Sequence, residues 1–396
     1  GDNVAFEYRM GDGEAAAAAF AGADRVAEIE LVNNRVVTNY MEPRGVVAEY
    51  DRETGRWTIT VGSQGGHSMR GVIAADILKV EPARMRIVTP DVGGGFGTKM
   101  FVFGEYPLAA VAAERLGRPV KWIGERGEHF LGDSQGRDNL AKARLALDAE
   151  GRFLALEVDL LADMGAYLAQ FAPHIPFVGA TMATGLYDIP ALAMRIRGVY
   201  TNTVTVDAYR GAGRPESAYL IERLVDRAAE VVGLSRDEIR RRNFVAPDRL
   251  PYKTPTGRTY DSGEFAGHME RAMEKADWSG FAARRAASAA RGRYRGIGLA
   301  SYVEAAAFPS AEEATARLGD DGVVTILIGT QSNGQGHETA YAQIAAVHFD
   351  IDIDRIRVVQ GDTDLIARGG GTGGSRSIPI GGVSVDRASV ALVEKI

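Results

Sequence analysis

Polar and apolar side chains alternate along several segments of the chain, and this alternation predicts β-strands. Residues 84–89 are a clear example, because they alternate up to Pro90 and Asp91, which end the segment. Strand patterns recur at 26–38, 45–50, 56–61, 119–123, 141–147, 153–162, 194–201, 311–318, 322–328 and 356–359. The turn 320–322 is expected to join two of these strands as a hairpin.

Other segments carry apolar residues at helical spacing. Residues 104–116 form such a segment, which Gly117 and Pro119 close. Further helices are predicted at 216–232, 235–243, 262–276, 281–291 and 338–349, with a last one from about 382. Two other segments have weaker patterns: we expect a strand over 296–307 and a charged surface loop over 124–139. The exposed, Ala/Arg-rich helix 281–291 suggests a domain boundary near 280–292.

Five polar, glycine-rich loops lie between these elements, around Gln64, Phe96, Arg210, Gln335 and Ser375. At least three of them run straight into a helix, and free backbone N–H groups can converge on an anion there. Glycine also removes the Cβ atoms that would keep a bulky ligand away from the backbone. One such loop is more often a tight connection, but five of them indicate a large phosphate-bearing ligand held through backbone amides.

Common nucleotide, zinc and hydrolase motifs do not match. Thr98 separates Lys99 from the last glycine of its loop, so a P-loop fails. Thr98 and Met100 also occupy positions where a dinucleotide fingerprint needs glycine. His337 begins a sequence like the zinc motif H-E-x-x-H, but position 341 is tyrosine, and the hydrolase motif G-x-S-x-G is absent.

Composition narrows the classes further. A chain of 396 residues is long enough for two or more domains with a sizeable core. A net charge of −6 disfavours a general nucleic-acid binder, and no apolar run approaches the ~20 residues of a membrane helix. The chain has no cysteine, which excludes disulfides, iron–sulfur ligation and thiolate zinc sites within it. No signal peptide opens the sequence, and we expect a cytoplasmic protein.

Four motifs in a fixed order carry a resemblance to a known family. The motifs are DVGGGFGTK at 91–99, DAYRGAGRPE at 207–216, GTQSNGQGHET at 329–339 and GGTGGSRS at 370–377. The chain resembles the molybdopterin-binding large subunits of the xanthine dehydrogenase, aldehyde oxidase and aerobic carbon monoxide dehydrogenase family. This resemblance implies an α+β fold with two elongated molybdenum-cofactor-binding domains of mixed sheets and helices. We expect the first domain over 1–285, lacking part of its N-terminal region, and a truncated second one over 286–396.

The resemblance also implies roles for individual residues. Gln64 would hydrogen-bond a terminal oxo or sulfido ligand of molybdenum, Phe96 would present its amide beside the metal, and Arg210 would lie near the pterin. These three are the expected catalytic residues. The residues expected to bind the cofactor are Gly94, Gly95, Phe96, Gly97, Arg210, Gln335, Gly336, His337, Gly374, Ser375, Arg376 and Ser377. No side chain is expected to bind the metal, because the pterin dithiolene holds it in this family.

Departures from the family pattern indicate the subtype. Gly211 stands where the carbon monoxide enzymes carry a copper-binding cysteine, and Met100 where xanthine enzymes carry a substrate-binding glutamate. We therefore expect oxidation of an aldehyde or an N-heterocycle, with water as the oxygen source. No glutamate in the chain matches the family's general base, so a fragment or a subunit completed by a second polypeptide is expected, inactive when isolated.

The resemblance further implies a cofactor and partners. The cofactor would be molybdenum–molybdopterin in a dinucleotide form such as molybdopterin cytosine dinucleotide. The expected partners are an iron–sulfur small subunit, an FAD-binding medium subunit and the remaining part of the large subunit. Alternatives are a non-catalytic cofactor-binding or assembly module, a carbon monoxide dehydrogenase-like protein without the copper cysteine, and, disfavoured by its motifs, a nucleotide-binding enzyme.

Overall fold

The chain folds into two compact units that interleave along the sequence. The computed structural model describes residues 3–307 and 310–396. Unit 1 consists of Gly1–Val36 and Gly136–Glu304, and unit 2 of Val37–Gln135 and Ala305–Ile396. Each unit is thus built from two segments that are far apart in sequence. The division into cofactor-binding domains at 285 and 286 is a different partition of the chain and stays a prediction.

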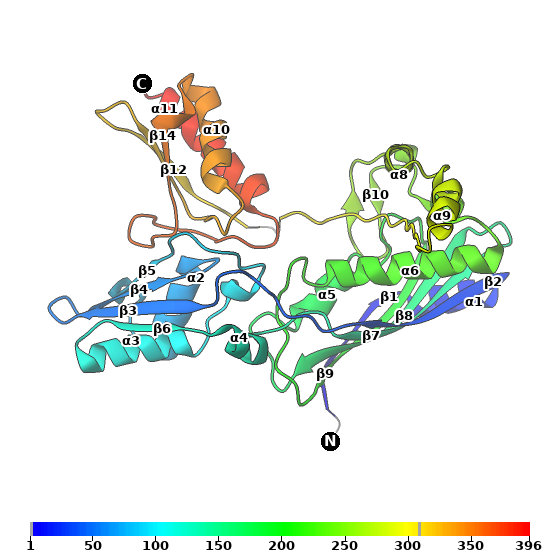
Figure 1. The fold of residues 1–396 in the computed structure, drawn as a ribbon, viewed down its shortest axis with the longest axis horizontal. Coiled ribbons are helices and arrows are strands. Elements are labelled where there is room, and N and C mark those ends of the chain that lie inside the picture. The colour runs from blue at the N-terminus through cyan, green and yellow to red at the C-terminus, as the bar shows by residue number, and fades with distance from the viewer. Residues whose placement is uncertain (1–2, 308–309) are drawn as a thin grey trace. The chain divides into compact units, whose positions relative to one another are not determined.

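Unit 1 is organised around a five-stranded sheet with helices on both faces (Figure 1). Neighbouring strands are antiparallel except for the parallel pair β8–β9. In spatial order the strands are β1 (Val4–Gly11), β9 (Ala191–Tyr200), β8 (Phe153–Gly165), β7 (Asn139–Leu147) and β2 (Arg25–Asn33). Helix α6 (Arg214–Val232) packs on the face that carries Leu145 and Leu156, whereas α1 (Gly13–Ala21) packs on the opposite face against Ala155.

Shorter elements complete unit 1. They are α5 (His174–Ala180), α7 (Arg236–Asn243), the hairpin β10 (Tyr252–Lys253) and β11 (Thr259–Tyr260), α8 (Phe265–Lys275) and α9 (Phe281–Ala289). The expected strand at 296–307 is wrong, because these residues pair with no neighbouring strand. The backbone N–H of Ser301 instead donates to the Glu222 carboxylate at 2.8 Å, so a side chain replaces the ladder partner there.

Unit 2 contains two sheets with helices on one face of each. The first sheet has the order β5-β4-β3-β6, and α3 and α2 cover the face that carries Ile59 and Ile87. Its elements are β3 (Gly45–Asp51), β4 (Arg56–Val61), α2 (Gly66–Gly71), β5 (Met85–Val88), α3 (Glu105–Leu116) and β6 (Val120–Ile123). Helix α2 continues as a π-helical segment, Val72–Leu78. The predicted strand at 84–89 and helix at 104–116 are confirmed by β5 and α3.

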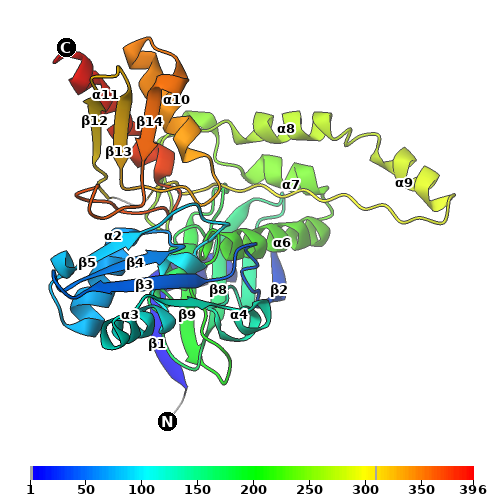
Figure 2. The ribbon, with the colours of Figure 1, turned by 60° about the vertical axis from the view of Figure 1, so that its left-hand side comes forward.

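The second sheet of unit 2 has the order β12-β13-β14 (Figure 2). Strands β12 (Ala314–Leu318) and β13 (Val324–Ile328) form the predicted hairpin, and β14 (Ile356–Val359) is parallel to β13. Helices α10 (His337–Phe349) and α11 (Val383–Val393) both pack on its apolar face. The mixed sheets and helices confirm the predicted α+β class.

The expected surface loop at 124–139 is wrong. Residues Arg126–Gly132 form helix α4, whose first turn is capped by Glu125 and Glu128. His129 and Asp133 are buried and bind each other, although both are polar. The buried positions of this segment carry glycine and polar residues, and none carries an apolar side chain that would have shown the helical period.

Four loops of unit 2 extend from the carboxyl ends of strands. Residues 62–65 follow β4, 89–97 follow β5, 329–336 follow β13 and 360–377 follow β14. The pairs β4–β5 and β13–β14 are both parallel. The two loops of each pair therefore leave their sheet at the same end, the carboxyl end of the strands. Ligands commonly bind outside the carboxyl ends of parallel strands.

Candidate functional site

Hydrogen bonds connect these four loops into one site, with Gln64 at its centre. The Gln64 side chain donates from Nε2 to the Thr372 carbonyl at 3.0 Å and accepts the Gly97 N–H at 2.8 Å. Its backbone N–H donates to the Lys99 carbonyl at 2.9 Å, and its carbonyl accepts the Thr372 N–H at 2.7 Å. A carboxamide has two N–H donors and an oxygen with two lone pairs, so the buried Gln64 side chain can make two further hydrogen bonds, one as donor and one as acceptor.

The loop 93–97 has a backbone that only glycine-rich sequence adopts easily. Gly94, Phe96 and Gly97 have φ angles of 92°, 51° and 113°. A Cβ atom on Gly95 would lie 2.5 Å from Oε1 of Gln64, so glycine lets the amide approach. A left-handed conformation at a non-glycine residue costs on the order of 1–3 kcal/mol, and the surrounding contacts hold the half-exposed Phe96 in it.

The loop 329–336 leads into helix α10 and leaves polar atoms without partners. Asn333 Oδ1 and His337 Nδ1 are buried and have no hydrogen-bond partner among the described residues. Burial lowers the pKa of His337, so its ring is neutral near pH 7. A Cβ atom on Gly334 or Gly336 would meet open space, and both glycines have positive φ. Unpaired buried polar atoms beside open backbone at a helix N-terminus suit an anionic ligand with hydrogen-bonding groups.

The last loop is held by Arg376, whose guanidinium points into the protein. Its Nη1 atom lies 2.5 Å from Oε2 of the fully buried Glu312 and also donates to the Gly371 carbonyl at 2.9 Å. A Cβ atom on Gly371 would lie 2.3 Å from the Gln64 carbonyl oxygen. Arg376 therefore shapes the loop against Gln64, and its contact with a cofactor stays a prediction. Gly374 and Ser377 use their carbonyls within unit 2, for Ala307 N–H and Tyr341 Oη.

The fifth predicted loop, around Arg210, belongs to unit 1. The Arg210 carbonyl accepts a hydrogen bond from Nη2 of Arg137 at 2.7 Å, and its own side chain is exposed. Gly211 and Gly213 have φ angles of 99° and 92°, and Glu216 accepts the Gly213 N–H at 2.9 Å. The structure thus brings Gln64, Phe96, Gln335 and Ser375 into one unit, while Arg210 stands in the other.

Sequence reasoning missed several residues that assemble the site. Gln331 and Asn333 both donate to the Ser63 carbonyl at 2.8 Å, whereas the predicted Gln335 is exposed and accepts the Asn333 N–H. Thr372 donates to the Gln331 carbonyl at 2.6 Å. The quoted motif 329–339 contained Gln331 and Asn333, but nothing in a single sequence distinguishes their roles from that of Gln335.

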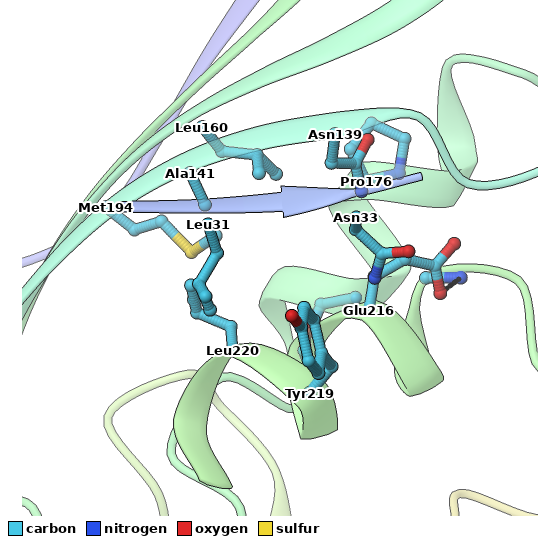
Figure 3. A pocket seen from close by; sticks show the side chains of 13 residues that line it. Leu31, Asn33, Asn139, Ala141, Leu160, Pro176, Met194, Glu216, Tyr219 and Leu220 are labelled. Carbon is cyan, nitrogen blue, oxygen red and sulfur yellow. Dashed lines mark hydrogen bonds between the residues drawn. The ribbon is translucent and has the colours of Figure 1, made fainter. Parts of the chain in front are cut away.

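Two pockets accompany these loops, one in each unit. A pocket of about 370 Å³ in unit 2 lies beside the site and is lined by Thr89, Pro90, Asp91, Gln331, Ser332, Glu338, Arg357, Val358, Val359 and Gln360. Figure 3 shows the pocket of unit 1, between β2 and α6. Leu31, Met194 and Leu220 form its apolar end, and Asn33, Asn139 and Glu216 lie at its polar end. The pocket in unit 2 shares Thr89, Gln331 and Gln360 with the four site loops, and the pocket in unit 1 shares Gly213 and Glu216 with the loop around Arg210.

The donor chemistry of unit 2 fits a large cofactor better than a bare metal ion. Within residues 3–307 and 310–396, no group of three His, Cys, Asp or Glu side chains could hold a metal. The loops instead offer backbone amides, carboxamides and a neutral imidazole, which hydrogen-bond an organic anion. Separately, none of the helices in the described ranges has the length and apolarity of a membrane span.

Comparison with known proteins agrees with this arrangement. The family model of the molybdopterin cofactor-binding domain matches residues 1–244, and a second model of the same description matches 271–396. The chain is 37% identical over 384 residues to the 6-hydroxypseudooxynicotine dehydrogenase complex subunit gamma of Paenarthrobacter nicotinovorans, covering 95% of this chain and 48% of that protein. It is 35% identical to the carbon monoxide dehydrogenase large chain of Hydrogenophaga pseudoflava, covering 98% and 50%.

A solved structure is similar over nearly the whole chain. Quinoline 2-oxidoreductase from Pseudomonas putida 86 superposes with a TM-score of 0.93 at 32% identity, covering 99% of this chain and 51% of that one. The chain spans about half the length of the curated relatives it matches. Both family models and these relatives confirm the resemblance inferred from the four motifs. The chain therefore belongs to the family of molybdopterin-binding large subunits that comprises xanthine dehydrogenases, aldehyde oxidoreductases and carbon monoxide dehydrogenases.

Proposed function

We propose that this chain is the cofactor-binding part of a molybdenum hydroxylase large subunit, acting in the cytoplasm on an aldehyde or an N-heterocycle. The observation that carries the proposal is that the loops 89–97 and 360–377 hydrogen-bond to Gln64 and the loop 329–336 hydrogen-bonds to Ser63 beside it. When bound, the molybdenum cofactor accepts the two electrons of the oxidation, and water supplies the oxygen. An iron–sulfur small subunit and an FAD-binding medium subunit carry the electrons onward.

The residues of the chain hold and orient the reacting groups in this proposal. The Gln64 carboxamide and the amides beside Phe96 would donate hydrogen bonds to ligands of the bound molybdenum, and Arg210 would contact the pterin. Gly336, His337 and the first amides of α10 bind a phosphate of the dinucleotide form, together with residues 374–377. We expect the general base, a glutamate, to come from residues outside this sequence.

The proposed substrate class follows from two positions of the sequence. A Cβ atom on Gly211 would lie 2.4 Å from Cγ of Pro215, at a φ of 99°, so a copper-binding cysteine does not fit there without a backbone change. Met100 packs its thioether against Gly373 and supplies no carboxylate for a purine. The relatives named for 6-hydroxypseudooxynicotine and quinoline support an N-heterocyclic substrate. A carbon monoxide dehydrogenase-like activity without the cysteine is the second candidate.

The test uses the complete large subunit purified with its partners. We expect about one molybdenum per large subunit, release of a nucleotide from the pterin by acid, and ¹⁸O from labelled water in the product. Turnover of quinoline or an aromatic aldehyde supports the proposed class, and turnover of carbon monoxide alone supports the second candidate. A protein without molybdenum, under conditions that load its relatives, would indicate a non-catalytic module.

A pair of variants tests the role of Gln64. Gln64→Leu should lower kcat/KM by about 10²–10³-fold per bound molybdenum, because one preorganised donor is lost. Gln343→Leu changes an exposed glutamine of α10 and should leave kcat/KM unchanged. Equal activity of both variants would contradict the proposed role.

A further inference from the structure

Lys99 is a fully buried lysine in the turn that directly follows the glycine loop. Its side chain is 0% exposed, and its Nζ atom lies 2.6 Å from Oε2 of Glu42 and 4.7 Å from the centre of the Tyr40 ring. Lysine is almost never fully buried without a partner, since removing an ammonium from water is costly. Burial lowers the pKa of the Lys99 amine, and the Glu42 carboxylate opposes this shift.

The same Glu42 carboxylate oxygen binds the first residue of the glycine loop. Oε2 of Glu42 accepts the Gly93 N–H at 2.9 Å, and the Glu42 N–H donates to the Gly93 carbonyl at 3.2 Å. A Cβ atom on Gly93 would lie 2.5 Å from Cβ of Glu42, so glycine is required for this approach. The ion pair therefore connects Gly93, where the loop begins, to Lys99, just after it ends.

The backbone of Lys99 reaches the other side of the site. Its carbonyl accepts the N–H of Gln64 at 2.9 Å. The ion pair also lies against the segment that leads to Gln64, because a Cβ atom on Gly62 would lie 3.2 Å from Oε2 of Glu42 and 3.7 Å from Nζ of Lys99. Lys99 thus contacts the segment that carries Gln64 directly and the glycine loop that carries Gly97 through Glu42. The Gln64–Gly97 hydrogen bond joins these same two segments.

We propose that Lys99, through its ion pair with Glu42, is a positioning residue that fixes the glycine loop 93–97 against Gln64. The proposal deepens the proposed function and rests on it for its consequence, which is that the ion pair sets how firmly the molybdenum cofactor is held. Lys99 itself acts through Glu42, Gly93 and Gln64. The geometry of the loop depends on the ion pair whether or not the cofactor is bound, so it can be tested in both states.

The test compares Lys99→Met, Lys99→Arg and Glu42→Gln in the complete large subunit with its partners. Hydrogen exchange followed by mass spectrometry should become at least about tenfold faster in peptides containing residues 62–66 and 93–97 of Lys99→Met. Molybdenum retained after dialysis should fall at least about threefold, and the Mo(V) electron paramagnetic resonance signal should change its g values. Lys99→Arg keeps the cation and should restore most of the exchange protection.

A matched control separates positioning from loss of a buried charge. Arg240→Met in unit 1 removes a fully buried cation paired with Glu222 at 2.8 Å, and it should leave the two peptides and the Mo(V) signal unchanged. If Lys99→Met fails to fold, Glu42→Gln replaces it as the test. This variant removes the negative charge that pairs with Lys99, while its amide oxygen can still accept from Gly93. It must show the same local change in exchange. Unchanged exchange in both peptides overturns the proposal. Wild-type protein without molybdenum overturns the proposed function alone, since the exchange measurement still applies.

Discussion

Asp207 shows how strongly one residue can be perturbed in the loop that carries Arg210. Its carboxylate is 2% exposed and accepts the N–H groups of Ala208 at 2.8 Å and Phe171 at 3.1 Å. Burial raises the pKa of Asp207 to about 7, and these two N–H donors oppose the shift. The side chain therefore gains a proton on folding at mildly acidic pH, which links the stability of unit 1 to pH.

Asp207→Asn should remove this dependence. A carboxyl group with a raised pKa contributes stability that is complete below about pH 4 and is lost as the pH rises to about 7. Relative to the variant, wild-type protein should lose roughly 1.4 kcal/mol of unfolding free energy per pH unit in that window. Urea unfolding of both proteins from pH 4.5 to 8 measures the difference. The exposed Asp248→Asn is the control, and a parallel pH profile for wild type and Asp207→Asn would contradict the prediction.

At the scale of elements, the glycine loop 93–97 is defined by what it excludes. A side chain on Gly95 would overlap the Gln64 carboxamide, and one on Gly93 would overlap Glu42. The loop therefore lies at van der Waals distance from two neighbours, which leaves Phe96 directed outward and half-exposed. This tight fit makes the loop sensitive to a single methyl group.

Gly95→Ala should destabilise unit 2 and displace Gln64. The new Cβ atom would lie 2.5 Å from Oε1 of Gln64, and overpacking of this kind costs about 1–3 kcal/mol. Gly104→Ala is the matched control, because its Cβ atom meets open space at a φ of −56°, and it should raise stability by about 0.4–1 kcal/mol. Urea unfolding and molybdenum per subunit measure both effects. The same stability for both variants would show that the loop yields to the methyl group.

The elements of the chain were predictable where their pattern was local. The helix at 104–116 and the hairpin around 320–322 follow from apolar spacing and turn residues within a few positions. Helix α4 was not predictable, because its buried residue His129 and the Asp133 that follows it are polar and bind each other. The segment 296–307 carries apolar residues but pairs with no strand. The N–H of Ser301 in this segment donates instead to the carboxylate of Glu222, which is distant in sequence. Periodicity reports which side chains are apolar, and it cannot report a buried polar network.

At the scale of the whole molecule, the candidate site was predictable only as a set of loops. The glycine content of the motifs indicated an anionic ligand, the position of Gln64 in a glycine-flanked loop marked it as a candidate, and the family resemblance supplied its role. Its partners were not identifiable, because the contacts that assemble the site join Ser63 to Gln331 and Gln64 to Thr372, 268 and 308 residues apart. The two interleaved units were not predictable for the same reason, because each unit joins two segments that are far apart in sequence. Contacts between remote segments leave no periodic signal in either segment.

The two segments of unit 2 are also joined along β5, and this gives a prediction about cooperativity. Residues 361–363 run alongside β5 and hydrogen-bond to its backbone. The N–H of Thr89 donates to the Gly361 carbonyl at 2.6 Å, and the N–H of Thr363 donates to the Ile87 carbonyl at 3.1 Å. Arg86 adds a bidentate ion pair to the largely buried Asp362, with Nε–Oδ1 and Nη2–Oδ2 distances of 3.0 and 2.5 Å.

Arg86→Met leaves the Asp362 carboxylate without this partner and should cost about 1–3 kcal/mol. Because both segments share the ion pair, hydrogen exchange should accelerate together in peptides covering 85–88 and 356–366. Arg9→Met, which removes a mostly exposed cation from unit 1, should change stability by less than about 0.5 kcal/mol. Acceleration confined to 85–88 would mean that the two segments of unit 2 open independently, and the site would then depend on the loop contacts alone.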